Sequence, residues 1–113
     1  MAARAPDVEL LWWEGCPSTD EALAMLREEM AALGLDPHAI DVREVSTDAD
    51  AQREEFVGSP TIRVDGRDVQ PLAQEPVGLT CRVYRLADGR ISPLPDRGEV
   101  RQTLRDAMKG GDD

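Results

Sequence analysis

Few side chains in this 113-residue chain could do covalent chemistry, and the clearest candidate is Cys16. It follows an apolar run with two tryptophans, and Ser18 and Glu21 behind it have the spacing of a capping box that opens a helix. The first turn of a helix offers unpaired N–H groups and the positive end of a dipole, which stabilise an anion. Cys16 is therefore predicted to be a thiol that is favoured as thiolate and able to act as a nucleophile.

The second cysteine, Cys81, has two readings. It alternates with Val83 on the strand expected at residues 79–86, which predicts a buried core thiol. The alternative is that the preceding loop carries Cys81 close to Cys16, so that it resolves disulfides made there. Two cysteines make no disulfide framework, and in a reducing compartment both are expected as thiols. The single histidine, His38, lies in an expected loop without a partner at metal-ligand spacing, and no metal site is predicted.

Composition narrows the class of partner. The net charge of -10 and the pI near 4.5 argue against a nucleic-acid or anionic-membrane surface, because the field of the chain would repel both. The sequence contains no apolar segment of signal or membrane-spanning length, so a cytoplasmic protein is expected. We expect one domain over residues 1–113, with a core at about 8–108 and flexible ends at 1–7 and 109–113.

The role proposed for Cys16 requires a strand before it and a helix after it, and the hydrophobic patterns of the sequence predict both elements. Residues 8–13 are almost all apolar, which predicts a strand covered on both faces. Residues 19–33 have helical periodicity and end before Gly34, and residues 39–45 alternate like a strand. A strand, a helix and a strand at this spacing predict a right-handed crossover with the two strands parallel.

The second half of the sequence predicts a surface helix, two strands and a closing helix. Residues 48–56 predict a helix that Ser46 or Thr47 caps, residues 61–64 predict a short strand, and residues 67–78 have the character of a loop. Residues 79–86 predict a fourth strand, which a turn at 87–90 joins to Ile91 in a hairpin. Asp96 and Glu99 repeat the capping-box spacing before the last helix. The simplest fold is α/β, with a mixed four-stranded sheet of two parallel and two antiparallel strands and helices on both faces.

Two motifs resemble the thioredoxin-like superfamily over about residues 8–108. They are WEGCPST at residues 13–19 and GSPT at residues 58–61, which match the cysteine motif after the first strand and the cis-proline segment before the third. GCP, GSPT and CRVY resemble small bacterial proteins, some of them selenoproteins, that are labelled thioredoxin-like or alkylmercury-lyase-like. The family's second cysteine corresponds to Thr19, which implies a single-thiol site.

Neighbouring residues have expected roles as well. Thr19, on the first turn of the predicted helix, would donate its hydroxyl to the Cys16 thiolate. The resemblance implies a cis peptide bond before Pro60, which would lie beside the sulfur. The Ser59 backbone would pair with an extended substrate. Trp13 and Pro17 are expected to contact the substrate as well. Trp13 follows another tryptophan in the predicted strand, so the two side chains face opposite sides, one toward the core and one toward the site.

These residues predict a monothiol redox protein that exchanges through Cys16 with disulfides, glutathione or a peroxide-derived sulfenic acid, as a candidate thiol–disulfide oxidoreductase. Glutathione or another thiol would be the co-substrate, no other cofactor is expected, and the partner would be a small disulfide or a protein disulfide. One alternative is mercury binding or organomercurial cleavage by Cys16 and Cys81, with Glu14 or Asp20 as acid. Another is a binding module without catalysis.

The arginines of the predicted hairpin are a last candidate feature. They are expected on its solvated side, with an alternative role as a docking patch for an acidic thiol such as glutathione; they are Arg82, Arg85 and Arg90.

Overall fold

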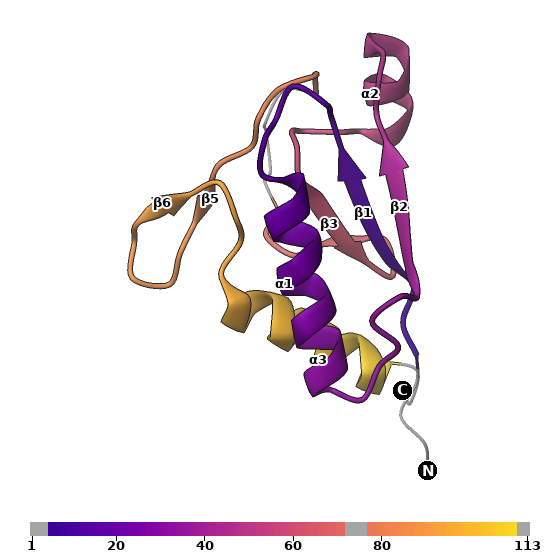
Figure 1. The fold of residues 1–113 in the computed structure, drawn as a ribbon, viewed down its shortest axis with the longest axis vertical. Helices are drawn as coiled ribbons and strands as arrows, with labels where there is room; N and C mark the ends of the chain where they lie inside the picture. Colours follow the sequence, from indigo (N-terminus) through magenta and orange to yellow (C-terminus); the bar gives the residue numbers. More distant parts are fainter. Residues whose placement is uncertain (1–4, 72–76, 111–113) are drawn as a thin grey trace.

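The computed structural model describes residues 5–71 and 77–110. Its elements follow in the order β1 (Val8–Trp12), α1 (Thr19–Ala32), β2 (Ile40–Glu44), α2 (Asp48–Glu54), β3 (Thr61–Val64), β4 (Arg67–Asp68), β5 (Tyr84–Arg85), β6 (Ile91–Ser92) and α3 (Arg97–Gly110) (Figure 1). The helices and the first three strands thus lie within a few residues of the predicted ranges. None of the described helices is long and apolar enough to cross a membrane.

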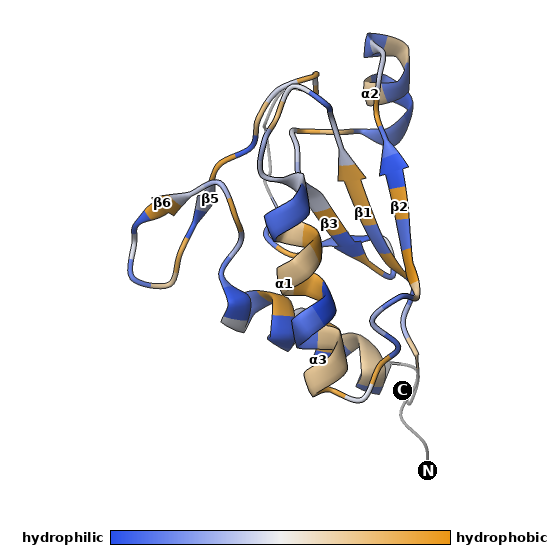
Figure 2. Cartoon of the chain, in the orientation of Figure 1, coloured by the Kyte–Doolittle hydropathy of each residue, from blue (hydrophilic) through white to orange (hydrophobic). Residues whose placement is uncertain are grey.

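Strands β1 to β4 form one mixed sheet in the order β2-β1-β3-β4. Strand β1 pairs parallel with β2, so that Leu10 lies opposite Val42, and antiparallel with β3, so that Leu10 lies opposite Ile62. The outer strand β2 alternates apolar and charged residues and is largely exposed (Figure 2). The predicted α/β class, the mixed four-stranded sheet and the parallel pair are confirmed.

The predicted fourth strand is wrong. Residues 67–68, expected in a loop, form β4, while residues 84–85 pair with β6 in a separate two-stranded sheet. The reason is a tight turn: Asp65 and Gly66 have φ values of 53° and 79°, the left-handed conformation of both central residues in a two-residue hairpin turn. The chain therefore folds back on β3 at once.

Two apolar clusters cover opposite faces of the sheet, because adjacent residues of β1 point in opposite directions. Leu10 belongs to a large cluster with residues of α1, β3 and α3, and α1 contacts α3 beside it. Leu11 belongs to a smaller cluster with Val45, Ala51 of α2 and Phe56. Helices thus cover both faces of the sheet, as predicted.

The helix starts differ from one another. Thr47 caps α2 by accepting the Asp50 amide at 3.0 Å, as predicted. Asp96 precedes α3 and accepts the Gly98 amide at 2.8 Å. Ser18 precedes α1 but makes no side-chain cap, so the capping box predicted behind Cys16 is not formed.

Candidate functional site

Cys16 lies between β1 and α1 with 6% of its surface exposed. Its Sγ donates to the carbonyl oxygen of Ser59 at 3.3 Å, and the Ser59–Pro60 peptide bond is cis. Ser59 and Pro60 are buried directly before β3, the strand that pairs with β1. The two motifs singled out in the sequence therefore meet at one point, with the sulfur of one against the backbone of the other.

Cys81 also lies beside Ser59, through its backbone. A parallel bridge joins it to Ser59, whose amide donates to Thr80 O at 2.8 Å while the Arg82 amide donates to Ser59 O at 2.8 Å. Cys81 is exposed, and its Sγ donates to Gly15 O at 3.9 Å, next to Cys16. The prediction of a buried Cys81 is wrong, since the segment carries it over the site and not into the core.

The two thiols influence each other. Hydrogen bonding with Cys16 raises the pKa of the Cys81 thiol above its ordinary value, and desolvation adds to the increase. Both cysteines are free thiols in the structure. Cys81 therefore keeps its proton to higher pH than an isolated cysteine does.

Trp13 forms a wall beside these groups. Its amide donates to Ser59 Oγ at 3.0 Å, and its indole lies so close over Gly15 that a Cβ there would stand 2.3 Å from ring atom Cη2. Trp12 packs against the large cluster and Trp13 against the small one, so the two side chains face opposite sides as predicted.

Two predicted contacts are not made. Thr19 Oγ1 is buried without a hydrogen-bond partner in the described part of the chain, so it does not donate to Cys16. The Ser59 backbone is already paired with residues 80 and 82, so the pairing expected for an extended substrate is taken up by the chain's own segment. Pro17 is exposed beside the sulfur-bearing residue.

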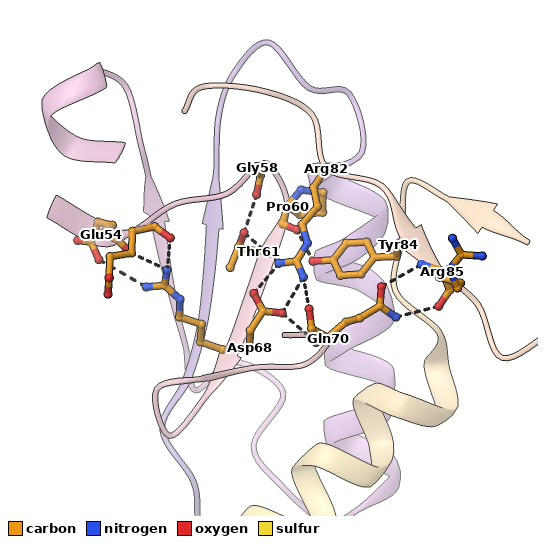
Figure 3. A network of polar contacts seen from close by, with 11 residues as sticks. Glu54, Gly58, Pro60, Thr61, Asp68, Gln70, Arg82, Tyr84 and Arg85 are labelled. Atoms are coloured by element: carbon orange, nitrogen blue, oxygen red, sulfur yellow. Dashed lines mark hydrogen bonds and ion pairs between the residues drawn. The ribbon is translucent and has the colours of Figure 1, made fainter. Parts of the chain in front are cut away.

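An arginine that sequence reasoning assigned to solvent lies at the centre of a buried network (Figure 3). The Arg82 side chain is 1% exposed and forms a bidentate pair with Asp68, at 2.6 Å to Oδ2 and 2.8 Å to Oδ1. It also donates to Gln70 O at 2.5 Å. The expectation of a solvated Arg82 is wrong, whereas Arg85 and Arg90 are exposed.

Tyr84 completes this network. Its ring lies 4.3 Å from the Arg82 guanidinium, and its hydroxyl donates to Pro60 O at 2.5 Å. Burial raises the pKa of Tyr84, so the hydroxyl is a protonated donor. A signal was present in the sequence: Arg82 and Tyr84 are two residues apart, so they share a face in extended chain, and a tyrosine marks that face as the inner one.

The described residues contain no group of three or more histidine, cysteine or acidic side chains that could hold a metal ion. Glu14 and Asp20, the acids of the organomercurial hypothesis, are both exposed. The site consists of the thiols of Cys16 and Cys81, the Ser59 carbonyl oxygen that accepts a hydrogen bond from Cys16, and the indole of Trp13 beside them.

Comparison of the chain with protein-family models, with curated proteins and with solved structures gives no match. The resemblance to the thioredoxin-like superfamily rests on the residues quoted for it and stays a prediction.

Proposed function

We propose that the chain is a thioredoxin-like thiol–disulfide oxidoreductase in which Cys16 and Cys81 alternate between two thiols and one disulfide. The observation that carries the proposal is the meeting of both cysteines at Ser59, one through its sulfur and the other through its backbone. The element order and the contact of Cys16 Sγ with Ser59 O, directly before Pro60 and β3, support the thioredoxin-like assignment. The resolving role weighed for Cys81 thus replaces the single-thiol cycle in this proposal.

The cycle balances with a low-molecular-weight disulfide as oxidant. The Cys16 thiolate attacks one sulfur of the oxidant, the oxidant's S–S bond breaks, and the leaving thiolate takes up a proton. Cys81 loses its proton and attacks the Cys16 sulfur of the mixed disulfide, which releases the second thiol. The protein loses two electrons and two protons, and the oxidant becomes two thiols. The raised pKa of Cys81 favours Cys16 as the first nucleophile.

The first prediction concerns the product of oxidation. On incubation of the reduced chain with oxidised glutathione, intact mass spectrometry is expected to show a loss of two hydrogen atoms and no retained glutathione. Cys16→Ser and Cys81→Ser are each expected to stop at a single glutathione adduct, because the second thiol that would release it is gone. Wild-type protein that accumulates glutathione on both cysteines, with no internal disulfide, would contradict the proposal.

Mercury binding is a second candidate, because two adjacent thiolates are soft ligands. The exposed positions of Glu14 and Asp20 do not favour carbon–mercury cleavage, so the candidate is binding alone. A titration with Hg²⁺ would then saturate at one ion per chain, and either serine variant would lose the tight site. Saturation at two ions, one for each separate thiol, would exclude it.

A further inference from the structure

The segment that carries Cys81 lies outside the four-stranded sheet. Its backbone contact with the site is a bridge to Ser59, formed by one hydrogen bond on each side of Cys81. The thiol itself is exposed, and beside its interaction with Cys16 it makes a long contact of 3.9 Å to Gly15 O. The position of the thiol therefore depends on these two backbone bonds and on how the neighbouring residues of the segment are held.

Arg82, the next residue, is an anchor of this segment. Its guanidinium reaches Asp68 of β4 with two hydrogen bonds, and it approaches Thr61 Oγ1 of β3 at 3.4 Å (Figure 3). Strands β3 and β4 are paired within the sheet, and β3 also pairs with β1, which leads to Cys16. The ion pair thus ties the Cys81 segment to the framework that positions the other thiol.

Packing leaves this anchor little freedom. Gly58 has φ +138° and lies so close to the segment that a Cβ there would be 2.8 Å from Arg82 Cβ. On the other side the Tyr84 ring lies against the guanidinium, and its hydroxyl is bonded to Pro60 O. Consecutive Cα atoms are about 3.8 Å apart, so fixing Arg82 confines Cys81 to a small region above Ser59.

We propose that Arg82 and Asp68 are positioning residues that hold Cys81 against Cys16 and thereby set the reduction potential of the Cys16–Cys81 pair. This inference rests on the proposed function. Two thiols that are already held together lose little conformational freedom when their disulfide forms. Releasing Cys81 lowers the effective concentration of one thiol at the other, so the disulfide becomes easier to reduce.

The test compares Asp68→Asn and Arg82→Lys with the wild-type chain. Asparagine retains the shape of Asp68 without its charge, and lysine retains the charge of Arg82 without the planar fork that binds a carboxylate with two bonds. Each protein is equilibrated in glutathione buffers of graded ratio, and the disulfide fraction is measured by mass spectrometry. Both variants are expected to show an equilibrium constant for disulfide formation at least about tenfold lower, a shift of about 30 mV toward easier reduction.

Glu29→Gln is the matched control. Glu29 is a second carboxylate paired with arginine, and its partners Arg97 and Arg101 lie on α3. Among the described residues, the hydrogen bonds and ion pairs of these arginines run to Glu28 and Glu29 of α1 and not to the cysteine segments. It is expected to lower the thermal midpoint without changing the equilibrium constant. Circular dichroism of each variant establishes that it is folded at the temperature of the redox measurement.

The outcomes separate the two proposals. An internal disulfide in the wild-type chain with an unchanged potential in both Asp68→Asn and Arg82→Lys overturns the positioning role and leaves the proposed function intact. An equal shift in Glu29→Gln also overturns it, because the effect would then follow from general destabilisation. Absence of an internal disulfide in the wild-type chain overturns the proposed function and the inference together.

Discussion

Glu29 shows how a single side chain can connect two helices. It lies on α1, its side chain is 4% exposed, and it accepts hydrogen bonds from Arg101 at 2.6 Å and from Arg97 at 3.1 Å. The Arg101 hydrogen bond lowers the pKa of Glu29, against the opposing effect of burial. The arginines are about half exposed, so water screens part of this attraction.

The pKa shift gives a prediction with a definite sign. Because the folded pKa of Glu29 lies below its ordinary value, its contribution to stability is complete above that ordinary value and is lost as pH falls through the folded pKa. Glu29→Gln is expected to lower the free energy of unfolding by about 1 kcal/mol at neutral pH, and by less at about pH 3. Urea unfolding at both pH values measures this.

The control for this prediction is Glu28→Gln. Glu28 pairs with Arg97 as well, but its side chain is 62% exposed, so the change is expected to have little effect. A Glu29→Gln deficit that is the same at both pH values would show that the loss is one of packing and not of charge.

The positions of site residues were predictable where they belong to a local sequence motif. The meeting of Cys16 with Ser59 and Pro60 followed from the resemblance, because each motif fixes its own place beside a strand. The position of Cys81 was not predictable, since alternation in an extended segment gives two faces without saying which faces the core. The ion pair of Arg82 with Asp68 of β4 turns the Arg82 side chain inward and the neighbouring Cys81 outward, and Asp68 belongs to a different element.

Elements were predictable to the extent that their signals are local. Helical periodicity and the caps at Thr47 and Asp96 gave the helices to within a few residues. Strand β4 has two residues and no pattern of its own, and it exists because the Asp65-Gly66 turn places it beside β3. Its neighbours in space, not its sequence, make it a strand.

The start of α3 carries a prediction at this scale. Asp96 accepts the Gly98 amide at 2.8 Å and the Ala87 amide at 2.9 Å, and these bonds lower its pKa, the Ala87 bond most. Asp96→Ala removes both contacts and is expected to lower the free energy of unfolding by about 1 kcal/mol, measured in urea. Ser18→Ala is the control at a helix start without a side-chain cap. An equal loss in Ser18→Ala would contradict the capping role of Asp96.

At the scale of the whole molecule, β1 separates two apolar clusters and ends at the site. The large cluster joins α1, α3 and the inner strands, and the small cluster lies beneath α2. Pairing of β1 with β2 and β3 brings the ends of distant segments to Cys16. The site is therefore a product of the sheet as a whole, which explains why no single stretch of sequence contains it.

The two neighbouring tryptophans acquire different environments from this arrangement. The indole of Trp13 lies over Gly15, whose carbonyl oxygen is 3.9 Å from Cys81 Sγ and which directly precedes Cys16, whereas Trp12 packs into the cluster on the other face. A disulfide accepts an electron from an excited indole at short range, so oxidation is expected to quench Trp13 emission. Trp12→Phe should retain the change and Trp13→Phe should lose it. If Trp12→Phe abolishes the change, the signal comes from the far face. Trp13 fluorescence would thus report the redox state of the two thiols, and Trp12 would serve as an internal standard.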